Sequence, residues 1–282
     1  MHKILLIPAT LNIVTNCWKE AEAELRGGIE KKYHDLDEEF ITRLFYGEFA
    51  YSLNQASGKG LIRRAFLIDL QNAFPKLRNS RELNAIPNAL IAEVSLHKRE
   101  VERITGGDFG LTIIRPQVFS PPYNKHELWI EQYEQGLLCQ AKIKRRNGKF
   151  GKLTKKQKEV LPGRMDYLSL LLYSYKDDPN RCQLNEFCWQ LCKNASIESA
   201  EEWLKLSNFP NTITSEKIIK DLGSGLIGTH DREIIKNIIR SKDKPNIIIR
   251  IFWPPDKHPR NRIHIYSSQN TVTEEKITMN RR

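Results

Sequence analysis

The sequence predicts an α/β protein with a mixed sheet flanked by helices, and three observations carry that prediction. Residues 15–84 repeat apolar side chains at helical spacing. Two short apolar runs, 109–114 and 136–143, are typical of buried strands. A third run, 246–253, is rich in isoleucine and ends at two prolines, a composition that favours a strand.

Residues 1–84 are expected to form a mainly helical N-terminal region. Segments 37–46 and 65–71 both place apolar side chains three and four residues apart. Acids at the start of the first segment include Glu38 and Glu39. Their favourable interaction with the positive end of a helix dipole explains them better than a role in a catalytic site.

The rest of the chain, residues 85–282, is expected to form the α/β core. An amphipathic helix is predicted over residues 88–103, and it leads into Gly106 and Gly107. Glycines allow a tight turn and close approach of the backbone. This turn would present Asp108 at the start of the first buried strand.

Further helices are predicted after the two buried strands. Residues 154–175 would pack as a helix across the sheet, and residues 180–244 would form a helical insertion. Strands at 246–253 and 262–266 would then join the same sheet, with a separate C-terminal domain as the alternative. The glycine-rich stretch 222–230 lacks the Lys-Ser or Lys-Thr that completes a phosphate loop, so it is interpreted as a connection.

Polar residues at the edges of the two buried strands predict a chemical site. Asp108 opens one strand, and Gln140 and Lys142 end the next. Residues i and i+2 of a strand project from the same face, so these three side chains are expected in one cleft. A carboxylate and an amide carbonyl suit a hard cation such as Mg²⁺, and a lysine can orient water or stabilise charge on phosphorus. The pattern predicts metal-dependent cleavage of a phosphodiester.

The order Asp…Gln-x-Lys, preceded by Gly-Gly and followed by a basic loop and a helix, resembles the PD-(D/E)XK or restriction-endonuclease-like nucleases. It is most similar to the Mrr-like branch, in which Gln replaces the acid, and it covers residues 93–175. By position, the resemblance implies a restriction-endonuclease-like core in which Asp108, Gln140 and Glu102 bind the metal. Lys142 would be the catalytic lysine. Because an amide replaces one acid, Mg²⁺ or Mn²⁺ should be held more weakly than usual.

A basic segment follows the second buried strand. Residues 142–158 contain nine Lys or Arg residues and no acid, and such a run favours a polyanionic partner. A solvated basic loop is the alternative. The resemblance also implies a supporting role for Gln157 at the start of the next helix. The expected nucleic-acid contacts are Lys144, Arg145, Arg146, Lys149, Lys152, Lys155 and Lys156.

Whole-chain properties agree with a nucleic-acid enzyme. The formal charge is +11 and the pI is about 9.4, which favour polyanions. No apolar stretch approaches the roughly 18–20 residues that span a bilayer, so no membrane partner is expected. Five cysteines, an odd number, fit a reducing compartment, and a cytoplasmic location is predicted.

The sequence therefore predicts an endonuclease, with DNA preferred over RNA because the resembled family mostly cuts duplex DNA. A role in bacterial defence or restriction, with a homo-oligomer or partner subunit, is part of the same expectation. One alternative is a nucleic-acid-binding regulatory protein that keeps an inactive nuclease fold. Another is an assembly subunit that binds protein through surfaces near Trp129 or Trp203.

Overall fold

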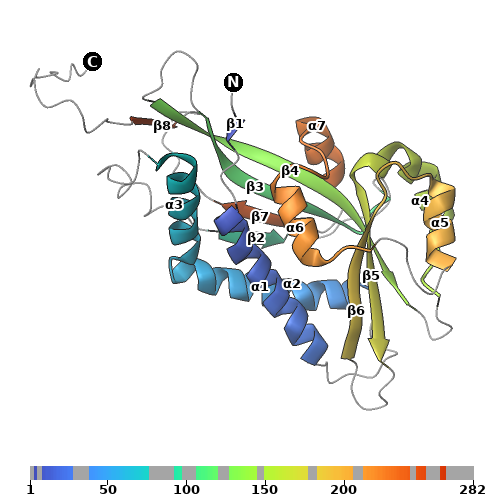
Figure 1. Ribbon diagram of the computed structural model, residues 1–282. Coiled ribbons are helices and arrows are strands. Elements are labelled where there is room, and N and C mark those ends of the chain that lie inside the picture. The colour runs from blue at the N-terminus through green and yellow to red at the C-terminus, as the bar shows by residue number, and fades with distance from the viewer. Residues whose placement is uncertain are drawn as a thin grey trace, which may run out of the picture.

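The structure is a computed structural model. It describes residues 3–4, 8–27, 38–75, 92–96, 106–119, 127–144, 149–176, 183–205, 212–241, 246–251 and 261–264. Within these residues the protein is α/β, with one mixed sheet and helices packed against it (Figure 1). No helix in the described ranges is long and apolar enough to cross a membrane.

The first part of the chain is helical, as predicted. It contains α1 (Pro8–Gly27), α2 (Glu38–Gly58) and α3 (Leu61–Ala73). Asp69 of α3 fixes the start of α1, because its carboxylate accepts hydrogen bonds from the backbone N–H groups of Ala9 and Thr10 at 2.8 and 2.9 Å. The predicted helices at 37–46 and 65–71 are confirmed for the residues described.

The described strands form an eight-stranded sheet in which six strands follow the order β2-β7-β3-β4-β5-β6. Short strands β1 and β8 pair with β3 and β4. β3 and β4 are antiparallel, whereas β3–β7 and β4–β5 are parallel, so the sheet is mixed. The strands are β1 (Lys3–Ile4), β2 (Ala92–Leu96), β3 (Phe109–Phe119), β4 (Glu127–Ile143), β5 (Leu168–Lys176), β6 (Gln183–Leu191), β7 (Asn246–Ile251) and β8 (Asn261–His264).

Four strand predictions are confirmed. β3 and β4 contain the two buried runs, and β7 and β8 contain the described parts of the two C-terminal runs. β7 and β8 pair with β3 and β4, so they join the predicted sheet.

Three helix predictions are wrong in part, because each contains a strand. Within 88–103, Ala92–Leu96 is β2, which pairs with β7. Within 154–175, helix gives way to β5 at Leu168, and within the insertion 180–244, Gln183–Leu191 is β6. A short apolar run fits a strand buried on both faces as well as a helix, and here neighbouring strands supply the backbone hydrogen bonds.

The remaining helices are short. Two of them lie between β4 and β5, and four follow one another between Ile197 and Ile239. Residues 224–230, after the end of α6, form a connection, as predicted for this stretch. The helices are α4 (Lys155–Val160), the 3₁₀ helix η5 (Leu161–Tyr167), α5 (Ile197–Lys205), α6 (Ser215–Gly223), α7 (Arg232–Ile234) and the π-helical turn η6 (Ile235–Ile239).

The sheet separates two hydrophobic clusters. One joins α1 and α2 to the sheet, with Trp18 packed 6.1 Å from Trp189 between ring centroids. The other joins η5, α5 and η6 to the opposite sheet face through Leu138 and its neighbours. Because side chains alternate along a strand, Gln140 and Lys142 project from the same face as Leu138.

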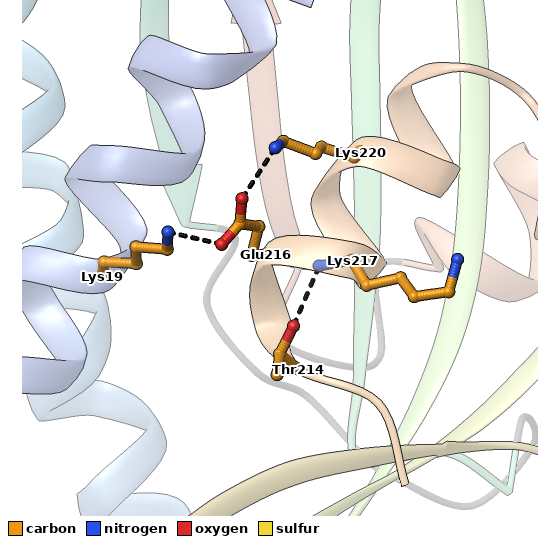
Figure 2. A network of polar contacts seen from close by, with 5 residues as sticks. All are labelled: Lys19, Thr214, Glu216, Lys217 and Lys220. Carbon is orange, nitrogen blue, oxygen red and sulfur yellow. Dashed lines mark hydrogen bonds and ion pairs between the residues drawn. The ribbon is translucent and has the colours of Figure 1, made fainter. Parts of the chain in front are cut away.

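Helix α6 is tied to α1 by an exposed ionic network (Figure 2). Glu216 of α6 pairs with Lys19 of α1 and with Lys220, one turn further along α6. Thr214 caps the helix by accepting a hydrogen bond from the Lys217 N–H at 3.3 Å. Figure 2 shows Lys19 and Lys220 approaching the Glu216 carboxylate from opposite sides.

Candidate active site

Asp108 lies at the start of β3, opposite Gln140 of β4. Phe109 pairs with Cys139 in the antiparallel ladder, and the Asp108 N–H donates to the Cys139 carbonyl at 2.8 Å. Continuing that register by one residue places Asp108 beside Gln140. The two residues thus meet because of strand pairing, across 32 positions of sequence.

The two glycines before Asp108 are required by close packing. Gly106 has φ of 77°, and a Cβ there would lie 2.9 Å from Cδ2 of Leu161 in η5. A Cβ on Gly107 would lie 2.5 Å from Cδ1 of Leu138. The turn that presents Asp108 therefore packs between η5 and β4, and this close approach agrees with the tight turn predicted from the two glycines.

The Asp108 carboxylate accepts two hydrogen bonds from β4. Its Oδ2 accepts a hydrogen bond from the Ala141 N–H at 2.7 Å and another from Nε2 of Gln140. One donor belongs to the backbone of β4 and the other to a side chain of the same strand. The carboxylate is consequently fixed against the end of β4.

Gln157 completes a chain of amides that ends at Asp108. Its Nε2 donates to Oε1 of the fully buried Gln140 at 2.8 Å. Its Oε1 accepts from the Thr154 N–H at 2.9 Å, and its own N–H donates to Thr154 Oγ1, which makes a capping box at the start of α4. The structure brings Gln157, the predicted supporting residue, into direct contact with the site.

Lys142 lies one strand period beyond Gln140 and is only 6% exposed. It pairs across the parallel ladder with Leu172 of β5 and makes further interactions of its own. The aliphatic part of its side chain is therefore buried, on the face of the sheet that also presents Gln140 and Asp108. Hydrogen bonds join Asp108, Gln140 and Gln157, and Lys142 lies on the same strand face as Gln140.

Other predicted site residues are placed differently. Glu102, Arg145 and Arg146 lie outside the described residues. Lys144 follows the last residue of β4, and its Nζ lies 5.8 Å from the ring centroid of Phe150. Lys149 and Lys152 are exposed on the segment leading into α4, and Lys155 and Lys156 are exposed on α4 itself, the helix that carries Gln157.

The described site residues offer a carboxylate and an amide, which are oxygen ligands of the kind that Mg²⁺ takes. No group of three or more His, Cys, Asp or Glu side chains that could hold a metal occurs in the described ranges. Asp108 would supply a carboxylate, and Gln140 Oε1 keeps a second lone pair beyond the one that Gln157 uses. Mg²⁺ commonly retains several waters and needs one or two carboxylates, so this small set fits it.

Burial also shifts the pKa values of two side chains on η5. Burial raises the pKa of Tyr167, and the nearby Arg164 guanidinium partly offsets that rise. Burial lowers the pKa of Arg164 from its ordinary value. Lys158 of α4 is also exposed, and it is paired with Glu201 of α5.

Two residues near the site were missed by the sequence prediction. Thr154 was detectable, because Thr-x-x-Gln before a helix is a capping signal. Gln190 of β6 shares a row with Gln140 through Leu170, and its buried Oε1 has no hydrogen-bond partner. The alternating pattern of 183–191 could have revealed it if the segment had been interpreted as a strand.

Comparison with known proteins found no matching family model and no similar curated protein. The functional assignment therefore depends on the residues and geometry of this chain.

Proposed function

We propose that this protein is a divalent-metal-dependent endonuclease that hydrolyses phosphodiester bonds in DNA. The main support is the contact of Gln140 with Asp108, which joins a carboxylate and an amide from two strands on the face that carries Lys142. The placement of α4 and η5 between β4 and the parallel β5 also supports a restriction-endonuclease-like core. A role in bacterial defence or restriction is part of this proposal.

Each residue has a role in the proposed reaction. Asp108 would hold the cation, and the Gln140 carbonyl would join it as a second oxygen ligand once the amide turns Oε1 instead of Nε2 toward Asp108. The bound cation would activate water and stabilise charge on the phosphate. Lys142 orients the attacking water or stabilises the pentavalent phosphate by its positive charge. Gln157 fixes the orientation of the Gln140 amide. Exposed lysines beside α4 bind the nucleic-acid backbone.

Cleavage assays test the proposal. Supercoiled plasmid, single-stranded DNA and RNA are incubated with Mg²⁺ or Mn²⁺ and wild type, Asp108→Asn or Lys142→Met. Asp166→Asn and Lys193→Met serve as controls, since both residues are exposed. We expect wild type and controls to cut DNA and both site variants to lose at least about 100-fold of the rate, in line with loss of one preorganised electrostatic group. Equal cutting by the site variants would overturn the assignment.

One observation favours a second function, that of a nucleic-acid-binding regulator with an inactive nuclease fold. Gln140 Nε2 donates to the Asp108 carboxylate, so the pair satisfies its hydrogen bonds without a cation. This function predicts DNA binding that survives EDTA and no cleavage with either metal. It also predicts that Mn²⁺ leaves the melting temperature unchanged, whereas a cation bound at Asp108 would raise it.

A further inference from the structure

Helix α3 has one buried face and one outer face of distinct composition. Its buried side chains recur at helical spacing and pack into the N-terminal helices: Ile62, Ala65, Phe66, Asp69 and Leu70. Its outer face carries Arg64, Ile68 and Asn72 at intervals of four residues, all exposed. Ile68 is 50% exposed, so packing of the fold does not account for it.

The outer face of α3 carries positive charge alone. Asp69, the helix's one acid, is buried and accepts hydrogen bonds from Ala9 and Thr10 at the start of α1. The first turn has no acid and contains Arg63 and Arg64. Lys59, exposed in the preceding turn, adds a third cation. A phosphate backbone complements such a surface.

A short turn connects α2 to α3. Lys59 and Gly60 form the turn, and Gly60 has φ of 69°, a value that glycine adopts readily. Figure 1 shows α3 running across the direction of α2 at one end of the molecule, with α4 and α5 at the other. Two helices joined by a short glycine-containing turn are a common arrangement for reading DNA.

We propose that the outer face of α3 enters the major groove of duplex DNA. A helix of 13 residues is about 20 Å long, and the helix diameter of about 10–12 Å fits the roughly 12 Å width of that groove. Arg64 and Asn72 have the side chains that bind guanine and adenine edges, and Ile68 can contact a thymine methyl. Lys59 and Arg63 bind flanking phosphates. The inference rests on the proposed function for the choice of DNA.

Binding without cleavage tests the inference. Fluorescence anisotropy with a 30-base-pair duplex in EDTA compares wild type with Arg63→Ala/Arg64→Ala across a salt series. Arg232→Ala/Lys236→Ala is the matched control, because both residues are exposed and the same charge is removed from α7 and η6. We expect the α3 pair to weaken binding about tenfold or more and to reduce the salt slope by about one to two. The control should stay within about twofold of wild type.

A second measurement separates base reading from charge alone. Selection of bound duplexes from a randomised pool should yield a preferred sequence for wild type, and Asn72→Ala should change it with little loss of affinity. Circular dichroism and thermal melting confirm that the variants fold. Equal losses in the α3 and control pairs overturn the inference, as does preferential binding of RNA or of a protein by α3.

The outcomes for the site and for α3 are distinguishable. If the α3 pair binds DNA normally while Asp108→Asn abolishes cutting, the α3 inference fails and the nuclease proposal stands. If wild type never cuts DNA but its binding depends on Arg63 and Arg64, the α3 inference stands and the nuclease proposal fails.

Discussion

At the scale of single residues, burial determines what each polar side chain can do. Gln140 is fully buried, and both polar atoms of its side-chain amide are hydrogen-bonded. Its Nε2 donates to Asp108, and its Oε1 accepts from Gln157. Buried polar groups are costly unless they are paired, so this chain of side chains is constrained in geometry. Replacing any member should disturb its neighbours.

Gln157→Ala tests the role of that chain. It removes the donor to Gln140, whereas Thr154→Ala disturbs the same capping box but leaves that donor in place. Both should lose roughly 1 kcal/mol of unfolding free energy. We expect Gln157→Ala alone to raise the Mg²⁺ concentration required for half-maximal cleavage. Equal Mg²⁺ dependence in the two variants would limit Gln157 to helix capping.

Arg115 of β3 shows the opposite situation, a buried charge that is only partly satisfied. It is 1% exposed, and burial lowers its pKa to about 10. Its Nε donates to the Gly223 carbonyl at 2.5 Å and the guanidinium lies over the Tyr133 ring. Both terminal nitrogens have no hydrogen-bond partner.

Arg115→Met should therefore leave the protein as stable as wild type or more stable by about 1 kcal/mol, because apolar replacement of a poorly compensated buried charge is often favourable. Urea unfolding measures the difference. A loss above about 2 kcal/mol would mean that the bond to Gly223 and the Tyr133 contact outweigh the burial cost.

At the scale of elements, close approach of backbones fixes how helices lie on the sheet. A Cβ on Gly110 of β3 would lie 1.9 Å from the Ile239 carbonyl oxygen, and one on Gly136 of β4 would lie 2.9 Å from Ile239 Cδ1. The π-helical turn η6 therefore rests directly on two glycines of adjacent strands. Arg240 then pairs with Glu134 of β4 at 2.6 Å.

Gly110→Ala should destabilise the protein by about 1–3 kcal/mol, since the added methyl group requires the η6 backbone to move. Gly47→Ala is the matched control: it lies in α2 with nothing within 4 Å of the added atom. That change should stabilise by up to about 1 kcal/mol, because alanine favours a helix. Chemical denaturation of both variants gives the comparison, and equal effects would contradict the packing of η6.

The network between α1 and α6 should make stability depend on pH. Hydrogen bonds from Lys19 and then Lys220 lower the pKa of Glu216 to about 2, from 4.5. A lowered carboxyl pKa contributes stability above the unfolded value that is lost as pH falls through the folded value. Glu216→Gln should thus melt slightly lower than wild type at pH 6, with the difference vanishing toward pH 2 and in 1 M salt. A constant difference at all pH values would exclude this ionic origin.

At the scale of the whole molecule, the N-terminal helices and the sheet share one hydrophobic cluster. Trp18 and Phe45 of these helices contact Trp189 and Phe187 of β6, with ring centroids 6.1 and 5.2 Å apart. Removal of the helices would expose that aromatic surface to water. The positive net charge acts at the same scale, because it favours polyanions over the entire surface.

Deletion of residues 1–84 should therefore give a protein that aggregates or lacks cooperative unfolding. The full chain should instead unfold in a single transition, with near-ultraviolet dichroism of the tryptophans and far-ultraviolet dichroism of the backbone changing together. Two separate transitions in the full chain, or a soluble and cooperative truncated protein, would contradict the shared core.

The amino-acid sequence by itself determined the helical N-terminal part, strands β3, β4, β7 and β8, and the shared strand face of Gln140 and Lys142. Local periodicity and the two-residue repeat of a strand contain that information. The contacts of Gln140 with Asp108 and with Gln157 depend on the pairing of β3 with β4 and on the position of α4. The tertiary structure alone decided that Ala92–Leu96, Leu168–Lys176 and Gln183–Leu191 are strands. β2 pairs with the distant β7 and β5 pairs with β4, while β6 pairs with the adjacent β5. A continuous apolar run such as that in β5 becomes a strand only where neighbours bury both faces.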